Sequence, residues 1–178
     1  METYEGVKFR YRLVEKELPQ DDVKRYLKLD ASLREFLDPQ ENEGNMSMRL
    51  AEGFLIKRAG AKMTELTEKD VSLVVGVEEG EVVAAGAVPS SEARMHYEIY
   101  KAEPTAKMVL HFHNDSLLES FEEPAIGPFP YGSLGLAEAA GKAANSHRMF
   151  KIREHGFVLI AKDEEELLQS MKDIQNGD

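Results

Sequence analysis

The sequence predicts an α/β fold in which helices cover a largely antiparallel central sheet. Two pairs of apolar segments flank short turns that contain glycine, a pattern typical of β-hairpins. Residues 46–50 and 54–57 flank Ala-Glu-Gly, and residues 71–77 and 81–88 flank Glu-Glu-Gly. Segments with helical periodicity lie around these hairpins. Hairpins interleaved with helices favour an antiparallel sheet over a doubly wound parallel one.

The chain before the first hairpin supplies one strand and one helix. Apolar and basic residues alternate over 7–13, which predicts an early strand. Pro19 and the acidic pair that follows it are typical of a helix start. We expect that helix to run to about residue 37, because Pro39 cannot continue it.

The second half of the chain alternates between helices and strands. We first expect a helix that is capped by Ser90 or Ser91 and runs to about Lys101, followed by a strand that carries His111 and His113. A helix of small residues over about 134–147, a strand over 157–161 and a helix from about Asp163 come next. The last helix has an acidic first turn, which its dipole favours. Its apolar face is formed by Leu167, Leu168, Met171 and Ile174.

Composition sets broad limits on organisation and location. The chain has 178 residues, of which 42% are hydrophobic, so residues 1–178 can form one domain with a substantial core. Cysteine is absent, so a metal would be held by histidine and carboxylate. No basic and apolar leader and no apolar run of membrane length is present. We therefore expect a soluble, cytoplasmic protein.

The charge balance argues against two classes of partner. The formal net charge is −11, and acidic residues cluster at 78–79, 119–123 and 163–166. Such a surface repels the phosphates of nucleic acids and the headgroups of anionic lipids. We expect neither nucleic acid nor membrane as a partner.

The most informative motif is a pair of histidines, His111 and His113, inside an apolar segment. Side chains alternate faces along a strand, so the two imidazoles would lie on the same face. They could simply be half-buried polar residues. A third histidine, His155, and a carboxylate, Glu92, favour a metal site. Three histidines fill three positions of a catalytic zinc and leave the fourth open.

A second motif, Pro-Ser-Ser-Glu at 89–92, lies at an expected helix start. Two hydroxyls and unpaired backbone N–H groups make a natural anion site there, and phosphate would suit it. The plainer interpretation is an N-cap with a spare serine. Glu92 is expected in the first helical turn. His96 lies four residues on, on the same helical face, and we interpret it as a supporting or core histidine rather than a ligand.

The motifs together resemble the class II aldolase/adducin family, over about residues 44–168, and most closely its fuculose-1-phosphate aldolase branch. The resemblance rests on Gly-Asn-Met-Ser (44–47), Ala59-Gly60, Pro-Ser-Ser-Glu (89–92), Met95-His96, His111-x-His113, Pro130-Tyr131 before Gly135, and His155-Gly156. Glutamate at position 92 favours the aldolases, since the related epimerases usually have aspartate there.

The resemblance implies a three-layer αβα fold and a zinc-dependent lyase. Such an enzyme cleaves a ketose 1-phosphate reversibly to dihydroxyacetone phosphate and an aldehyde, and it is a homotetramer. The implied zinc ligands are His111, His113 and His155, with Glu92 as the acid/base and a fourth ligand in the empty site. The implied phosphate ligands are Asn45, Gly60, Ser90 and Ser91.

Some features depart from the family pattern. The phosphate loop has Ala59 where the family often has threonine, and Leu136 follows Gly135 where threonine is common. No tyrosine lies within 114–130, the region from which larger members supply an acid to a neighbouring subunit. Tyr131 is a stand-in or a core residue. The 114–130 segment is rich in apolar residues, so it covers either a partner subunit or its own core.

Other functions stay open at this level. Epimerisation, dehydration or decarboxylation of a sugar phosphate would use the same zinc site. A non-enzymatic assembly module, as in adducin, would keep the fold. Retention of the three histidines and of Glu92 favours an enzyme.

Overall fold

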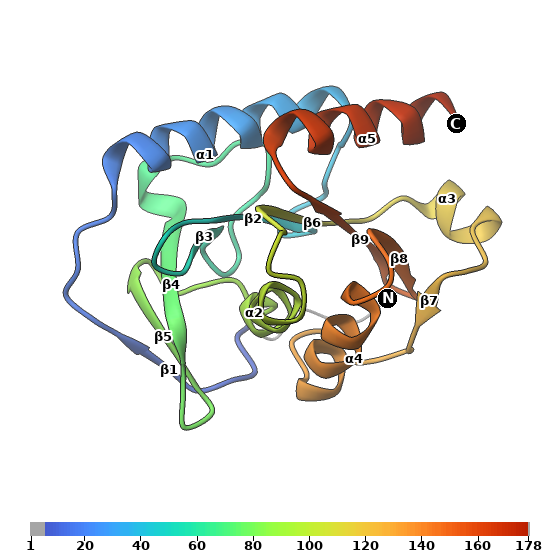
Figure 1. Ribbon diagram of the computed structural model, residues 1–178. Coiled ribbons are helices and arrows are strands. Elements are labelled where there is room, and N and C mark those ends of the chain that lie inside the picture. The colour runs from blue at the N-terminus through green and yellow to red at the C-terminus, as the bar shows by residue number, and fades with distance from the viewer. Residues whose placement is uncertain (1–5, 178) are drawn as a thin grey trace.

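The computed structural model describes residues 6–177, and within that range a nine-stranded sheet lies between two layers of helices (Figure 1). The strand order is β1-β5-β4-β3-β2-β6-β9-β8-β7. The strands are β1 (Tyr11–Leu13), β2 (Asn45–Arg49), β3 (Phe54–Lys57), β4 (Val71–Glu78), β5 (Glu81–Gly86), β6 (Met108–Phe112), β7 (Ala125–Ile126), β8 (Met149–Ile152) and β9 (Gly156–Ala161).

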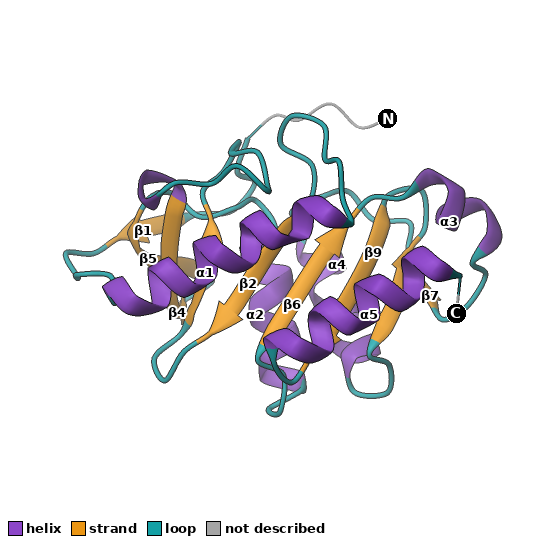
Figure 2. Ribbon diagram, turned by 90° about the horizontal axis from the view of Figure 1, so that it is seen from above, coloured by secondary structure: helices purple, strands orange, loops and turns teal. Residues whose placement is uncertain are grey.

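Helices cover both faces of this sheet. Figure 2 shows α1 (Gln20–Ser32) and α5 (Glu164–Asn176) crossing one face, with α2 (Ala93–Ala102) and α4 (Leu134–Ala144) behind the strands. The short helix α3 (Asp115–Ser120) lies at the β7 edge. Two 3₁₀ turns, Leu33–Glu35 and Glu68–Asp70, complete the elements of the described chain. The α/β prediction with helices on both faces is confirmed.

The prediction of a mainly antiparallel sheet needs correction, because the sheet is mixed. At its two edges β1 pairs in parallel with β5, and β7 pairs in parallel with β8. The pairs between them are antiparallel. Neither edge pair is a hairpin. A crossover through α4 returns the chain from β7 to β8, and crossovers of this kind join parallel strands.

Both predicted hairpins are present. Ser47 pairs with Ile56 across β2 and β3, and Val74 pairs with Ala84 across β4 and β5. The register of the second hairpin shifts between Val74 and Gly76, which marks a bulge. The hairpins place β2 at the centre of the sheet, next to the strand that carries the histidines.

Two apolar clusters divide the core, one on each face of the sheet. In β6, Met108, Leu110 and Phe112 belong to the cluster under α1 and α5, while Val109 belongs to the cluster under α2 and α4. This is the alternation predicted for the strand. Because Val109 and His111 share a face, the imidazole of His111 lies on the α2 side of the sheet.

The segment 114–130 packs against its own chain. Leu117, Leu118 and Phe121 lie against the first cluster, and Ile126 and Phe129 against the second. Its elements, α3 and β7, are too short to show periodicity in the sequence. No helix in the described range is long and apolar enough to cross a membrane.

Candidate metal centre

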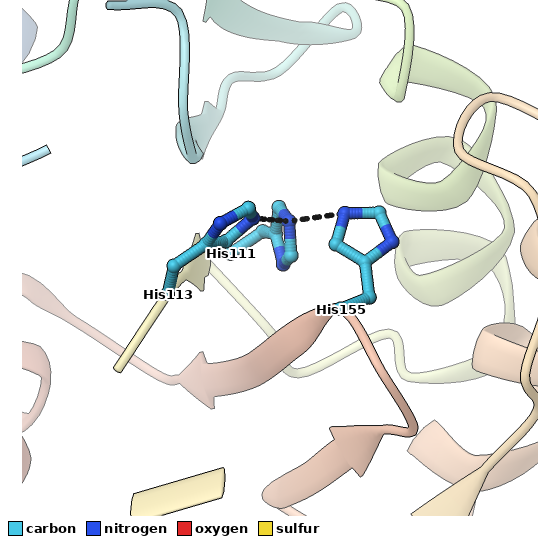
Figure 3. A group of neighbouring side chains, drawn as sticks. All are labelled: His111, His113 and His155. Carbon is cyan, nitrogen blue, oxygen red and sulfur yellow. Dashed lines mark hydrogen bonds between the residues drawn. The ribbon is translucent and has the colours of Figure 1, made fainter. Parts of the chain in front are cut away.

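Three histidines come together at one end of β6. His111 lies in β6, His113 follows its last residue, and His155 lies in the turn between β8 and β9. β6 and β9 are antiparallel neighbours in which Phe112 pairs with Phe157, so the start of β9 meets the end of β6. Figure 3 shows the three rings converging from these two strands. The predicted histidine cluster is therefore present in the structure.

The spacing of the imidazole nitrogens fits a tetrahedral metal ion. Nε2 of His111 lies 3.2 Å from Nε2 of His113 and 3.2 Å from Nε2 of His155. Two ligand atoms of a tetrahedral zinc with bonds of about 2.0 Å lie about 3.3 Å apart. Nδ1 of His111 lies 2.9 Å from the Phe157 carbonyl, to which it donates, so the lone pair of Nε2 points toward the other two rings.

Burial keeps two of these rings in the metal-binding form. Burial, helped by the neighbouring histidines, lowers the pKa of His111 well below its usual value. Burial and His155 likewise lower the pKa of His113. Neutral imidazole is the form that binds a metal ion. Glu43 supports His113 from outside, with Oε1 3.7 Å from Nδ1.

Glu92 completes the cluster. Its Oε2 lies 3.4 Å from Nε2 of His111, and its Oε1 lies 3.5 Å from Nε2 of His155. Oε1 is buried and has no hydrogen-bond partner among the described residues. An orphaned buried carboxylate oxygen beside three imidazoles is costly unless a cation or a proton compensates it. The residues therefore fit a divalent metal ion.

The helix start differs from the prediction. Glu92 is the N-cap residue of α2 rather than a residue of its first turn, and neither serine caps the helix. The reason is a tight turn, in which Ala93 N–H donates to the Ser90 carbonyl at 2.9 Å. In the same turn the Glu92 N–H donates to Ser90 Oγ at 3.4 Å. This turn aims the Glu92 carboxylate at the histidines instead of along the helix surface.

The predicted phosphate ligands lie around this helix start. Ser90 and Ser91 are buried, and Ser90 N–H donates to the Lys57 carbonyl at 2.9 Å. Gly60 lies in an exposed turn with φ of +75°, next in the chain to Ala59, whose N–H bonds to the Val88 carbonyl. The structure thus brings the Gly60 turn beside the two serines.

Asn45 is placed differently from the other three. It pairs with His111 across β2 and β6. Its amide nitrogen donates to Glu92 Oε2 at 2.7 Å, and its amide oxygen lies 2.5 Å from Nε2 of His96. The visible contacts of Asn45 are therefore with the acid/base candidate. A contact with phosphate stays a prediction.

Sequence reasoning missed Lys57, a buried cation near the site. Its ammonium donates to the carbonyls of Asn42 and Ala61, both at 2.7 Å. Burial lowers its pKa to about 8, although the negative charges of Glu92 and Asp30 oppose the change. The only sequence signal was a lysine at the end of the apolar strand Phe-Leu-Ile-Lys.

Tyr131, the predicted stand-in acid, is held by the N-terminal segment. Its side chain is buried, its hydroxyl donates to the Gly6 carbonyl at 3.4 Å, and the Lys8 ammonium lies 3.7 Å from its ring centre. The next residue, Gly132, approaches Ser91 so closely that an added Cβ would lie 2.8 Å from the Ser91 carbonyl oxygen. Tyr131 thus lies near the serines, and an acid role stays a prediction.

Comparison with known proteins agrees with this geometry. Residues 39–118 match the family model of the class II aldolase and adducin N-terminal domain. That range contains Glu92, two of the three histidines and all four predicted phosphate ligands. The match therefore places residues 39–118 of the chain with the class II aldolase and adducin family.

Relatives in this family have several activities. The chain is 36% identical over 74 residues to the L-fuculose phosphate aldolase of Escherichia coli, a match that covers 42% of this chain and 33% of that one. It is 28% identical over 156 residues to the 3-oxo-tetronate 4-phosphate decarboxylase of Pectobacterium atrosepticum, covering 74% and 70%. The first two curated relatives are matched over 22% and 64% of their own length.

A solved structure supports the fold over most of the chain. YgbL of Klebsiella pneumoniae, described as a putative aldolase/epimerase/decarboxylase, superposes with a TM-score of 0.75 at 21% identity, covering 90% of this chain and 88% of that one. At this identity the likeness concerns the fold. The class II aldolase fold is therefore established, and the reaction is a matter for the residues of the site.

Proposed function

We propose that this protein is a metal-dependent lyase of the class II aldolase family. It would cleave a ketose 1-phosphate of the fuculose-1-phosphate type to dihydroxyacetone phosphate and an aldehyde. The observation that carries this proposal is the position of Glu92. One of its carboxylate oxygens, Oε1, is buried and has no hydrogen-bond partner within residues 6–177. That oxygen lies 3.5 Å from Nε2 of His155, and the two serines precede Glu92 at the helix start.

The metal would be held by His111, His113 and His155, which form a three-residue cluster of potential ligands. The donor set of imidazoles with one nearby carboxylate suits zinc, although other divalent ions share it. When bound, such an ion supplies a Lewis acid for the carbonyl and hydroxyl oxygens of the substrate.

Glu92 would handle the proton at the reacting carbon. In the cleavage direction an ionised Glu92 would accept the hydroxyl hydrogen on carbon 4 as the bond between carbons 3 and 4 breaks. The electron pair of that bond would stay with carbon 3, and the oxygen on carbon 4 would become the aldehyde oxygen. Glu92 would then return its proton to carbon 3 to complete dihydroxyacetone phosphate. A general acid/base needs to lie within hydrogen-bond reach of the atom it serves, and its buried carboxylate beside the histidines meets that need.

The helix start would position the substrate. The hydroxyls of Ser90 and Ser91 can donate to a phosphate, with the Gly60 turn beside them, and the positive end of the α2 dipole favours an anion there. Fixing the phosphate there holds the reacting carbon near Glu92, which turns the reaction into an intramolecular step.

A second reaction on the same site has support of its own. The decarboxylase relative matches a larger share of this chain than the fuculose phosphate aldolase does, 74% against 42%. Decarboxylation, epimerisation and dehydration of a sugar phosphate would each use a base beside a Lewis acid. An adducin-like assembly role is less well supported, because the described chain keeps a complete set of donors.

A product assay separates these reactions. The zinc-loaded protein is incubated with a panel of ketose 1-phosphates and with a 3-oxo sugar-acid phosphate. We expect dihydroxyacetone phosphate from at least one ketose. The Glu92→Gln variant should keep its metal but turn over roughly 10²–10⁴ times more slowly, because an amide carries no proton. Release of carbon dioxide without triose phosphate would replace the aldolase proposal with decarboxylation.

A further inference from the structure

A continuous line of buried side chains lies behind Glu92. It contains Glu92, Asn45, His96, Ser47 and Tyr100 in that order. The successive contacts are 2.7 Å from Glu92 to Asn45, 2.5 Å from Asn45 to His96, 2.6 Å from His96 to Ser47 and 2.8 Å from Ser47 to Tyr100. All five side chains are buried.

The geometry of one strand and one helix produces this line. Asn45 and Ser47 are two residues apart on β2, so they share a face. Glu92, His96 and Tyr100 are four residues apart along α2, so they form one stripe. Two residues of a strand span about 6.6 Å, and four residues of a helix rise about 6 Å. The two sets therefore interleave.

The hydrogen bonds have one consistent direction. An ionised Glu92 can only accept, so Asn45 presents its NH₂ group to it and its carbonyl oxygen to His96. Nε2 of His96 must then carry the hydrogen, which leaves Nδ1 to accept from Ser47. The Ser47 hydroxyl already donates its hydrogen to His96, so it can only accept from Tyr100. The Tyr100 hydroxyl therefore donates to Ser47 at 2.8 Å, in preference to the Lys107 carbonyl at 3.3 Å.

We propose that this line of hydrogen bonds positions Glu92 by holding its Oε2, so that Oε1 is the oxygen that transfers the proton. Asn45 and His96 are then positioning residues, and the inference rests on the proposed function for its catalytic meaning. We call this line of five side chains the brace, because it fixes the Glu92 carboxylate in place. It does not conduct protons, since the Asn45 amide does not relay them. Oε1, the oxygen left without a partner among the described residues, is the one that faces His155.

The environment of His96 agrees with a fixed neutral ring. Burial lowers its pKa to about 3, with the charge of Glu92 opposing the change. The ring therefore stays neutral near pH 7, with a hydrogen on one of its two nitrogens. Only the tautomer with hydrogen on Nε2 satisfies both neighbours, since the other would set a lone pair against the Asn45 oxygen.

Nitrogen-15 NMR of histidine-labelled, zinc-loaded protein tests this assignment without any substrate. At pH 7 we expect His96 to show a protonated Nε2 and an unprotonated Nδ1, with its signals assigned by their loss in His96→Gln. The exposed His147 provides an internal comparison. A hydrogen on Nδ1, or averaging between the two tautomers, would overturn the proposed polarity.

Kinetics on the same protein test the positioning role. Glutamine can keep a donor where Nε2 lies, whereas leucine keeps none, so His96→Gln and His96→Leu form a matched pair. We expect His96→Leu to lower kcat by about 10- to 100-fold with KM changed less than threefold, and His96→Gln to recover most of the loss. Tyr100→Phe removes a hydroxyl from the far end and should cost less than fivefold.

Each outcome bears on one claim. Equal losses in His96→Leu and His96→Gln, or a loss confined to KM, would overturn the positioning role. If the tautomer is as expected and the wild-type protein cleaves no ketose 1-phosphate, the hydrogen-bonded brace stands and the proposed function fails. If cleavage is found and the tautomer is wrong, the brace fails and the proposed function stands.

Discussion

Single residues of this site owe their chemistry to burial. Lys57 is an example outside the histidines, since its ammonium is buried and bonded to two backbone carbonyls, those of Asn42 and Ala61. These carbonyls belong to the loops that precede β2 and follow β3. Lys57 therefore ties together two loops beside the candidate site, at the cost of taking a charge out of water.

This cost predicts how stability varies with pH. The pKa of Lys57 is about 8 in the folded chain against an ordinary value of 10.5. Between these values the unfolded chain binds more protons, so stability rises with pH across this window and the penalty is complete below pH 8. Urea unfolding measures this change. From pH 7 to pH 9.5 the free energy of unfolding of the wild type should rise by about 2 kcal/mol more than that of Lys57→Met.

The control for this comparison is Lys24→Met, which changes an exposed lysine of α1 and leaves the buried ammonium in place. Relative to this control the wild type should show no comparable gain. A difference between wild type and Lys57→Met that does not change with pH would mean that Lys57 is not perturbed by burial.

At the scale of elements, the geometry of the candidate metal centre depends on how closely β9 approaches β6. Gly156 begins β9 directly after His155. An added Cβ at Gly156 would lie 2.5 Å from the Phe112 carbonyl oxygen, 2.9 Å from His113 Cδ2 and 3.1 Å from His111 Cε1. Only a residue without a side chain lets the strands bring their histidines this close.

Gly156→Ala should therefore weaken metal binding. The new methyl group would displace the His113 ring or the backbone of β6, and disturbed support of a ligand typically costs 10- to 100-fold in metal affinity. Zinc competition with a chromophoric chelator measures the change. Gly76→Ala is the control, because a Cβ there meets nothing within 4 Å. Unchanged zinc affinity in Gly156→Ala would show that the close approach is unnecessary.

The sequence predicted elements well where periodicity is long. Both hairpins and the helices α1, α2, α4 and α5 were predicted, although α1 ends at Ser32, before the expected end near residue 37, and a 3₁₀ turn over Leu33–Glu35 follows it. The missed elements were α3, β7 and β8, which are short or lack an alternating pattern. The parallel edges could not be predicted, because they depend on which distant strands meet and not on local pattern.

The candidate site was predicted in part for a similar reason. His111 and His113 share a strand face, so alternation alone brings them together. The contact between Asn45 and Glu92 depends on the pairing of β2 with β6 and on the turn that makes Glu92 an N-cap residue. Both are tertiary features. The buried position of Lys57 is another, since a lysine in sequence is ordinarily read as exposed.

At the scale of the whole molecule, we propose that residues 1–178 act as one unit that assembles into a homotetramer, with the metal centre near a subunit boundary. The apolar side chains of 114–130 pack partly on their own core, so the boundary can also use other apolar surface. Tyr11 and Leu13 are exposed large apolar residues on the edge strand β1, and Leu134 is another at the start of α4. Such positions suit contacts between copies.

Light scattering on the purified protein measures the assembly directly. We expect a mass near four times the 20.0 kDa of the chain at micromolar concentration. A closed ring of identical subunits would give this mass without larger species. A monomeric mass would refute the tetramer and would require any aldehyde-side acid to come from the chain itself.

Hydrogen exchange into dihydroxyacetone phosphate tests the central claim most directly, because it needs Glu92 and the metal but no knowledge of the aldehyde. In D₂O, the reverse of the last cleavage step would let Glu92 remove one hydrogen from the hydroxymethyl carbon and return deuterium. Proton NMR should show loss of one hydrogen with the zinc-loaded wild type, and none above background with Glu92→Gln or with chelated protein. No exchange by a wild-type protein that holds one zinc per chain would contradict the account.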